Sequence, residues 1–295
     1  MFQRRSEKLT APLLPWAGEW GKERPRGKLV FAFVFAFVMT AIFVPFSIDA
    51  VGSHNSVRAS FGLAGALVGL TSMIALMPIL RVRHKTLPHE MNAEASIQGR
   101  SGLQIFYLSS WKNALYLWLA AGAAFLIIRG LTFFAQLRGR DSSAARSGLT
   151  IGGVAIVLIA LVMIAFLAYY MYSARNRRGF IALTDQGVAQ RSGHTEKNIS
   201  WSNIGSVSAD MVNNTHVVRL TPIPGVKIDI ATTSVFDRLQ RGLLERSIDM
   251  PVWVLGMDPA LFLHLVRFYW QHPEARHELG TDAVVGRMRR GDLLG

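Results

Sequence analysis

Four long apolar runs dominate the first 173 residues of the 295-residue chain. An α-helix rises about 1.5 Å per residue, so roughly 20 apolar residues cross the ~30 Å hydrocarbon core of a bilayer. We therefore predict membrane spans at 29–50, 61–80, 114–137 and 151–172. Together they predict an α-helical membrane bundle of four transmembrane helices over residues 29–173, preceded by a basic N-terminal arm at 1–28.

The fourth run ends in the way that is typical of a helix at a lipid headgroup layer. Three tyrosines and then three arginines follow one another there: Tyr169, Tyr170, Tyr172, Arg175, Arg177 and Arg178. Aromatic side chains favour the membrane interface, and arginines favour the headgroups just beyond it. We expect Arg175, Arg177 and Arg178 to contact lipid headgroups.

Basic residues are distributed unequally on the two sides of the predicted spans. The arm, the 81–112 segment and the end of the fourth span together hold 15 Lys and Arg residues. The opposite loops hold only Arg58, Arg138, Arg140 and Arg146. Because basic flanking residues stay on the cytoplasmic side, we expect a multi-pass protein of the cell (inner) membrane with both termini in the cytoplasm.

The net charge of +13 follows the same division. Residues 1–173 hold 17 Lys and Arg against 7 Asp and Glu, whereas residues 174–295 hold 15 against 12. The basic excess thus flanks the spans, so we expect contact with membrane lipids and none with nucleic acid. The chain contains no cysteine, which excludes disulfides and thiolate chemistry.

Beyond residue 178 the pattern changes to short alternating runs separated by turns, which is typical of antiparallel strands. We predict seven strands, at 179–184, 188–192, 197–201, 205–212, 215–221, 226–230 and 251–255. Helical spacing predicts further helices at 233–247, at 259–271 after the Asp258-Pro259 start, and through 273–279 and 282–290. Residues 174–295 are therefore expected to form a cytoplasmic α+β domain.

Two stretches of this domain resemble a known family. The run ALTDQGVAQRSG, followed by ISWSNIGSV, is similar to the first strands of bacterial pleckstrin-homology-like (PH-like) domains. The ending DPALFLHLVRFYWQHPEARHEL resembles the C-terminal helix of actinobacterial membrane proteins with such domains. The resemblance covers about residues 178–280 and implies a seven-stranded antiparallel barrel capped by a C-terminal helix. The helical stretch at 233–247 departs from that pattern, and the turn at 185–187 lacks the basic residues of the usual headgroup site.

Glycines and charges within the spans predict contacts between helices. Gly65 and Gly69 are one turn apart and allow a neighbouring backbone to come close. We favour packing within the chain over a homo-oligomer formed through these glycines. Asp49 and Arg129 are charges within the spans, where a charge is costly unless it pairs or reaches the headgroups. An Asp49–Arg129 pair and an Arg129 that extends outward alone are equally favoured.

Two segments outside the spans allow more than one interpretation. The arm carries Trp16 and Trp20 among several prolines, which suits either an irregular segment at the membrane interface or a disordered basic tail. The stretch 103–111, LQIFYLSSW, alternates and is rich in aromatic residues. We favour an interfacial segment there over a strand docked on the C-terminal domain.

No motif in the sequence indicates catalysis, a cofactor or a metal. The eight histidines lack the spacing of a zinc site, and the phosphate-binding, dinucleotide-binding and serine-nucleophile motifs are missing. The spans lack the paired titratable groups that membrane catalysis or proton coupling requires. We therefore predict a protein that is not an enzyme and uses no cofactor.

The leading hypothesis is a membrane-anchored adaptor or assembly component. It predicts a protein partner at Trp201, Phe268 and Tyr269 on the C-terminal domain. The alternative is a small transporter or channel subunit, whose lumen would be lined by the hydroxyl groups of Thr40, Thr71, Ser72 and Thr132. A fold hosts many functions, so the site has to decide between them.

Overall fold

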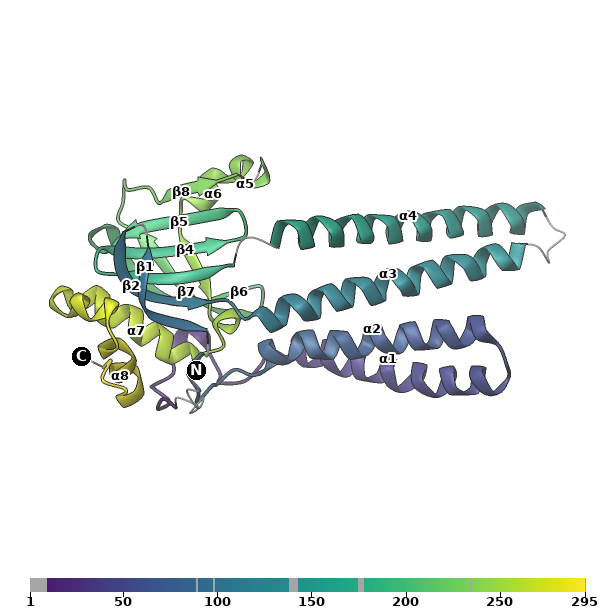
Figure 1. The fold of residues 1–295 in the computed structure, drawn as a ribbon, viewed down its shortest axis with the longest axis horizontal. Helices are drawn as coiled ribbons and strands as arrows, with labels where there is room; N and C mark the ends of the chain where they lie inside the picture. The colour runs from purple at the N-terminus through teal and green to yellow at the C-terminus, as the bar shows by residue number, and fades with distance from the viewer. Residues whose placement is uncertain are drawn as a thin grey trace, which may run out of the picture. The chain divides into compact units, whose positions relative to one another are not determined.

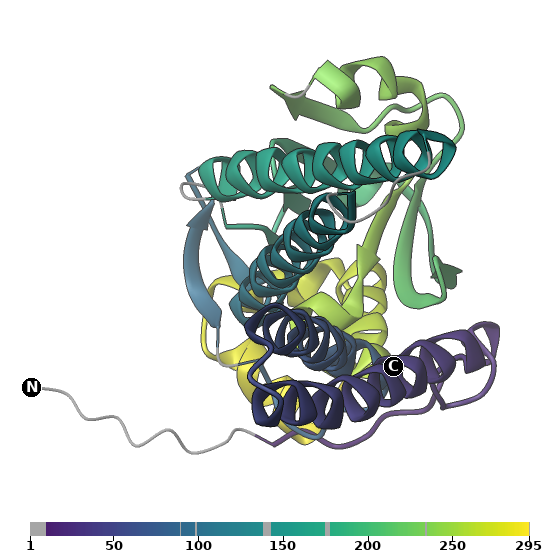
Figure 2. The ribbon, with the colours of Figure 1, turned by 90° about the vertical axis from the view of Figure 1, so that its right-hand side faces the viewer.

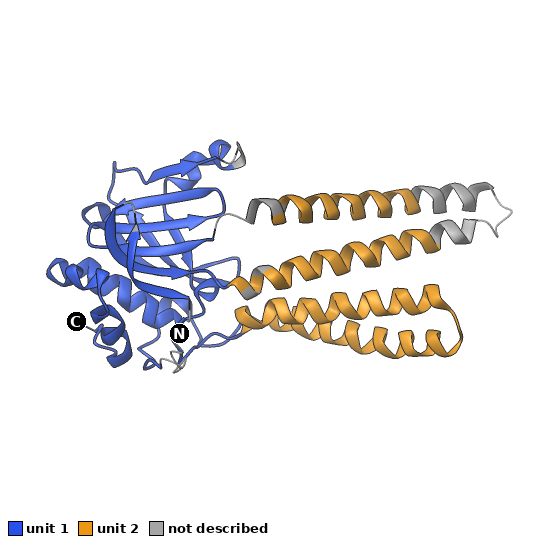
Figure 3. Ribbon diagram, viewed as in Figure 1, with its two compact units in different colours: residues 1–25, 81–108, 176–295 blue, residues 26–80, 109–175 orange. Residues whose placement is uncertain are grey.

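The computed structural model describes residues 10–88, 90–97, 99–137, 143–174, 178–233 and 235–294, and divides the chain into two units (Figure 3). Unit 1 comprises residues 1–25, 81–108 and 176–295, and unit 2 comprises residues 26–80 and 109–175. Unit 1 therefore combines three segments of the chain. The predicted domain of residues 174–295 contains only one of them.

Unit 2 consists of four long helices (Figure 1). They are α1 Gly27–Gly52, α2 Ser56–Leu80, α3 Ser109–Leu137 and α4 Ser143–Ala174. Each contains a stretch that is long and apolar enough to cross a membrane, as predicted. Large apolar side chains along them are exposed, including Phe31 at 72% and Val162 at 68%. A contiguous apolar surface of this kind requires an apolar solvent or a partner.

The four helices form an open row. α1 packs on α2, α2 on α3, and α3 on α4, and Figure 2 shows α4 beside α3. The buried share is 6% in the α1 span and 11% in the α4 span, against 28% in the spans of α2 and α3. Over their described residues, α2 and α3 are thus the inner helices, and α1 and α4 are the outer ones.

Small residues fix the hairpin of α1 and α2. A Cβ atom at Gly65 would lie 2.7 Å from the Phe43 ring, and one at Gly69 would lie 2.8 Å from the Ala36 carbonyl oxygen. Glycine is required for such an approach of two helices. Both glycines therefore act within the chain, and α1 occupies the face that a homo-oligomer through Gly65 and Gly69 would need.

Unit 1 contains two antiparallel sheets. The six-stranded sheet has the order β1-β2-β3-β4-β5-β8, and its strands are β1 Met91–Ile97, β2 Arg100–Phe106, β3 Phe180–Thr184, β4 Gly187–Ser192, β5 Thr195–Ser200 and β8 Asp229–Thr232. The three-stranded sheet has the order β6-β7-β9, with β6 Ile204–Val212, β7 Thr215–Pro222 and β9 Ile248–Pro251. The described strands form no closed barrel, in contrast to the predicted seven-stranded one.

The strands β1 and β2 come from the segment between α2 and α3. β2 pairs with β3 from Gly102 opposite Thr184 to Phe106 opposite Phe180. The Leu103 side chain faces the domain core and is fully buried. The interfacial interpretation of 103–111 is therefore wrong for 103–106, because the alternation there marks a strand whose partner follows α4 in the sequence. Residues 109–111 begin α3.

The N-terminal arm also packs into unit 1. Trp20, in the short 3₁₀ helix η1 Gly18–Trp20, is 1% exposed. Its indole Nε1 donates to the carbonyl oxygens of Asp210 at 2.9 Å and of Val217 at 3.2 Å, on β6 and β7. The disordered-tail interpretation is wrong for residues 10–25, because the Trp20 indole is a core side chain of the domain. The segment is irregular, as predicted, apart from η1.

Three local elements differ from the prediction. β9 ends at Pro251, which has no N–H to continue the ladder, and the predicted strand at 251–255 is instead a 3₁₀ turn, η3 Val252–Leu255. β8 starts three residues later than predicted, after a turn in which Gly225 has φ +87°. The predicted helix at 233–247 is split into α5 Val235–Leu239 and α6 Arg241–Leu244.

The rest of the C-terminal region follows the prediction. Asn213 and Asn214 take positive φ values of 49° and 63° in the turn between β6 and β7. The helices after Asp258 are α7 Pro259–Gln271, the 3₁₀ helix η4 Pro273–Gly280 and α8 Ala283–Arg290. α7 packs on β6 and β7 and buries its apolar stripe in the domain core.

A charged cluster joins the three segments of unit 1, and we call it the Arg83 clasp. The Nε of Arg83 lies 2.9 Å from a carboxylate oxygen of Asp258, which is fully buried. The same guanidinium donates to the Leu14 carbonyl oxygen at 2.9 Å and lies 5.3 Å from the Trp16 ring centroid. The other oxygen of Asp258 accepts from two backbone amides in the first turn of α7, at 3.0 and 3.1 Å.

Burial governs the pKa values within the clasp. It raises the pKa of the Asp258 carboxyl, while the α7 amides and the charge of Arg83 oppose this shift. It also lowers the pKa of the neighbouring His84 imidazole. Arg83 is therefore the counter-charge that makes a buried carboxylate tolerable at neutral pH.

Replacing Arg83 by alanine is expected to lower the free energy of unfolding of unit 1 by about 3–5 kcal/mol, because Asp258 would keep a buried charge without its partner. The loss should be larger at neutral than at acidic pH, since a carboxyl with a raised pKa destabilises the fold as it ionises. Tryptophan fluorescence during urea unfolding in mild detergent measures both effects. Arg290→Ala removes a solvent-exposed pair with Asp292 and should cost at most about 1 kcal/mol. Equal losses in the two variants would contradict the role of the clasp.

Candidate binding site

A polar pocket of about 270 Å³ lies at one end of the six-stranded sheet, and we call it the sheet-end pocket. It is formed where β2, β4 and β8 begin and where β3 and β5 end. Its lining is Arg100, Thr184, Gln186, Gly187, Val188, Ala189, Asn198, Ile199, Ser200, Asn203, Lys227 and Asp229. β2 runs from this end to Phe106 and then into α3, so the pocket lies at the sheet end opposite to that link.

The turn between β3 and β4 forms one wall of the pocket. The Thr184 hydroxyl donates to the Gly187 carbonyl oxygen at 3.0 Å and accepts from the Gly187 backbone nitrogen at 3.1 Å. A Cβ atom at Gly187 would collide with the Ile199 carbonyl oxygen, so the close approach of β4 to β5 requires glycine. The wall is therefore rigid and preformed.

Trp201 supports this wall from the core side. It is 2% exposed, its indole Nε1 donates to the Thr184 carbonyl oxygen at 2.7 Å, and its backbone nitrogen donates to the Gln186 carbonyl oxygen at 3.0 Å. The Arg276 guanidinium lies 5.2 Å from the centre of its ring. Trp201 thus positions the pocket, and its side chain is not available as the predicted partner surface.

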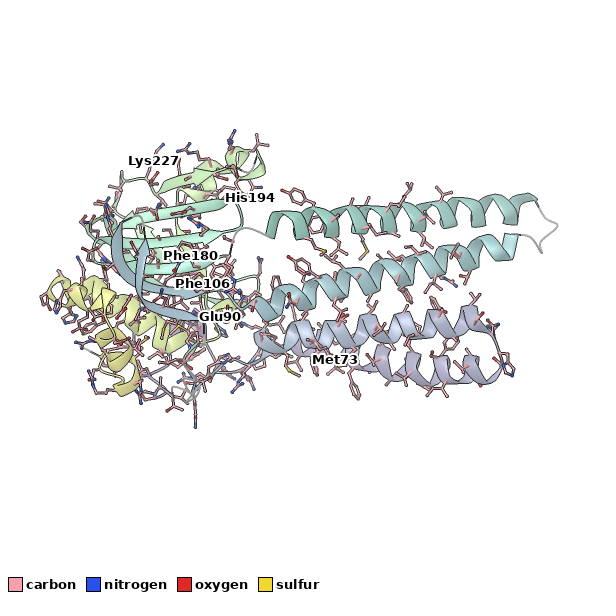
Figure 4. The ribbon with its side chains drawn as sticks, viewed as in Figure 1. Met73, Glu90, Phe106, Phe180, His194 and Lys227 are labelled. Atoms are coloured by element: carbon pink, nitrogen blue, oxygen red, sulfur yellow. The ribbon has the colours of Figure 1, made fainter. Side chains whose placement is uncertain are left out.

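The charges of the pocket come from segments that are far apart in the sequence. Arg100 is the first residue of β2. Lys227 precedes β8 and lies at the same end of the sheet (Figure 4). The Lys227 ammonium lies 3.5 Å from a carboxylate oxygen of Glu245, and its side chain is 80% exposed. Asp229 adds one carboxylate to the lining. The pocket therefore offers both cationic donors and an acceptor to a ligand.

The amide side chains of Gln186, Asn198 and Asn203 add donors and acceptors to the lining. Such a set can bind the backbone and a carboxylate of a polar peptide, and the volume admits only a small group. Across the described residues, no group of three or more histidines, aspartates and glutamates converges as a metal site. The arrangement is suited to recognition.

Unit 2 contains a groove of about 400 Å³ between α1, α2 and α3, with an almost entirely apolar lining. The polar group of note is the Ser72 hydroxyl, which accepts from the Trp118 indole at 2.8 Å and donates to the Val68 carbonyl oxygen at 2.7 Å. Thr40 and Thr71 likewise donate to carbonyl oxygens of their own helices, at 2.9 Å and 2.7 Å. The Thr132 hydroxyl donates to the carbonyl oxygen of Arg129 at 2.6 Å.

The hydroxyl groups predicted for a transport lumen therefore satisfy themselves within their own helices. Of these four residues, only Ser72 borders the groove. A water-filled path requires polar groups that face a common space, and these groups do not share one.

Asp49 and Arg129 are not joined by an ion pair among the described residues. Asp49 is exposed near the end of α1, and the Arg129 guanidinium carbon lies 5.8 Å from the centre of the Phe61 ring on α2. The Arg129 guanidinium thus lies near the ring of Phe61 and forms no ion pair with Asp49. Phe61 stacks in turn on Phe125, with 4.7 Å between ring centroids.

The predicted headgroup arginines fall partly outside the described residues, since Arg175 and Arg177 lie there. Arg178 is exposed, and its guanidinium lies 3.8 Å from a carboxylate oxygen of Glu90, which precedes β1. This contact joins the start of the C-terminal segment to the segment between α2 and α3.

The remaining predicted partner residues belong to the packing of α7. Tyr269 is fully buried, and its hydroxyl donates to Glu278 at 3.1 Å. Glu278 also accepts two hydrogen bonds from Arg287, whose guanidinium lies 4.4 Å from the centre of the Phe268 ring. Phe268 is partly buried beneath that guanidinium. The α7 residues therefore hold η4 and α8 in place, and Tyr269 presents no surface to a partner.

Sequence reasoning missed the pocket because its parts come from different segments. Arg100 is one of the basic residues counted in the 81–112 segment, and Gly99 beside it, with φ +80°, lies in the turn between β1 and β2. No comparable local signal relates Lys227 to Arg100.

No protein-family model, curated protein or solved structure matches the chain. The function is therefore argued from the geometry of the two units.

Proposed function

We propose that this chain is a membrane-anchored adaptor. In this proposal α1–α4 cross the cell (inner) membrane, and unit 1 works in the cytoplasm, where the sheet-end pocket binds a protein partner. The observation that carries it is that unit 1 draws on three segments separated by two helical hairpins. Two crossings return the chain to the side on which it began, so a four-span arrangement leaves all three segments on one side, where they can fold together.

The charge distribution supports the cytoplasmic side. The three segments of unit 1 contain most of the basic residues that flank the helices, and such residues remain in the cytoplasm. The antiparallel strands β3–β7 and the helix α7 also support a likeness to PH-like domains. The hairpin of β1 and β2 would then be an addition to that fold.

The chemistry of the pocket supports one class of partner. Arg100 and Lys227 bind a carboxylate, and the amide side chains around them bind peptide groups. We assign the pocket to a polar peptide segment that carries an acidic side chain or a free C-terminus. The transporter alternative lacks support, because the hydroxyl groups that it requires are bonded within their own helices.

Site-specific photocrosslinking in intact membranes tests the pocket. With p-benzoylphenylalanine at Ser200, an exposed residue of the lining, we expect an adduct of defined mass. When the crosslinker at position 200 is combined with both Arg100→Ser and Lys227→Ser, the adduct should be lost. The same crosslinker at exposed Asn213, in the turn of the other sheet, is the matched control. The proposal would be contradicted if both positions gave the same adducts, or if the adducts were unaffected by removal of the two cations.

Orientation can be tested with single cysteines, because the chain has none of its own. In sealed, right-side-out cells, a membrane-impermeant maleimide should label His54→Cys, in the turn between α1 and α2. It should label Asn214→Cys only after permeabilisation. The reverse pattern would place unit 1 outside the cell and would remove the basis for a cytoplasmic adaptor.

A further inference from the structure

The insert between β8 and β9 carries the two most exposed leucines among the described residues of unit 1. Leu239, at the end of α5, is 80% exposed, and Leu243, in α6, is 62% exposed. They are four residues apart, on two consecutive short helices. An exposed leucine forgoes the hydrophobic stabilisation that burial would provide, so two together indicate a surface that is covered in use.

Arginines flank these leucines in the sequence. Arg238 and Arg246 are exposed, and within the part of the chain that the structure describes neither forms an ion pair. The nearby acidic side chains are already engaged. Asp237 accepts a hydrogen bond from the Thr195 hydroxyl, and Glu245 accepts one from Arg241 at 2.9 Å. Positive charge therefore remains available beside the leucines.

The insert starts at the sheet end from which the chain continues into unit 2. Strand pairing places five residues in one row across the sheet: Phe106, Phe180, Arg191, Glu196 and Ala231. α3 begins three residues after Phe106, α4 ends six residues before Phe180, and α5 begins four residues after Ala231. Figure 4 shows His194, beside this row, and Lys227, at the pocket, at opposite ends of the sheet.

We propose that Leu239, Leu243, Arg238 and Arg246 form a second membrane contact, which docks on the anionic surface of the bilayer that holds α1–α4. The leucines would enter the boundary between headgroups and acyl chains, and the arginines would bind lipid phosphates. A bilayer is the occupant that fits best, because the short links to α3 and α4 keep this sheet end within a few residues of the spans. This membrane contact rests on the proposed function, because it requires the four helices to cross the membrane.

The consequence is a fixed orientation of unit 1. With one sheet end held at the lipid by the links and by the insert, the sheet-end pocket at the opposite end stays open to the cytoplasm. The insert thus provides a reason for the departure from the PH-like pattern at 233–247.

Fluorescent labelling of the full chain in lipid nanodiscs tests the contact. The Leu243→Cys variant is labelled with the environment-sensitive fluorophore nitrobenzoxadiazole. It is then compared in two kinds of disc, one of phosphatidylcholine alone and one of phosphatidylcholine mixed with phosphatidylglycerol. Lipids with a doxyl spin label on the acyl chain should quench position 243 strongly in the mixed discs and weakly in the neutral ones. Arg238→Ser and Arg246→Ser should each weaken docking about fivefold, the effect of one basic residue at an anionic surface.

Two matched positions control the experiment. Ile223→Cys places the label on an exposed apolar residue next to the pocket end of the sheet, and it should remain open to aqueous iodide. Leu67→Cys on α2 should be quenched by the doxyl lipids in all discs.

The outcomes separate the two proposals. If the label at 243 is as accessible to iodide as the label at 223, or if both are quenched equally by lipid, the insert is not a membrane contact. Quenching at 243 that ignores phosphatidylglycerol and both arginine variants would overturn the role of the charges. A label at 67 that is open to water would show that the helices are outside the bilayer, and the proposed function itself would fail.

Discussion

The backbone ladder between β2 and β3 is the constraint on which the rest of this structure depends. It pairs a strand that precedes α3 with a strand that follows α4, from Gly102 opposite Thr184 to Phe106 opposite Phe180. Without β2, the N–H and C=O groups on one side of β3 would be unpaired, although every residue of β3 is buried. The sheet is therefore complete only when segments on both sides of a helical hairpin are present.

The same dependence extends to the N-terminal arm. Trp20 fills a position in the core against β6 and β7, and the Arg83 clasp ties the arm and the middle segment to the start of α7. These contacts join residues that are widely separated in the sequence, and a topology rich in such contacts folds slowly. Unit 1 thus requires all three of its segments, which the helical hairpins separate in the sequence. An anchor and a binding domain interleaved in this way cannot be separated by cutting the chain at one point.

The elements that could be predicted from the sequence are those whose structure is determined by a local pattern of residues. Twenty consecutive apolar residues specify a helix in lipid whatever their neighbours are, so the four helices of unit 2 were predictable. Asn213-Asn214 specifies its own turn, and Asp258-Pro259 specifies the start of α7. The bulk of β3–β7 follows from alternation between such turns.

The predictions from the sequence were wrong where residues that contact one another in the fold lie far apart in the sequence. The stretch 103–111 shows both alternation and aromatic residues, and nothing within it reveals that Leu103 is buried against a strand beyond α4. Trp201 and Tyr269 were predicted to contact a protein partner, but both are buried, and their hydrogen bonds to Thr184 and Glu278 hold them in the core. The sheet-end pocket combines the β1–β2 turn with residues before β8, and no sequence window contains both.

Amide hydrogen exchange of the full chain in detergent tests the central claim most directly, because protection reports the pairing of individual strands. Peptides covering residues 100–106 and 180–184 should exchange equally slowly, as two strands of one ladder. The turn at Asn213 and Asn214 should exchange quickly in the same sample. If the 100–106 amides exchange as fast as that turn while 180–184 remains protected, β2 is not part of the sheet, and unit 1 is not built from three segments.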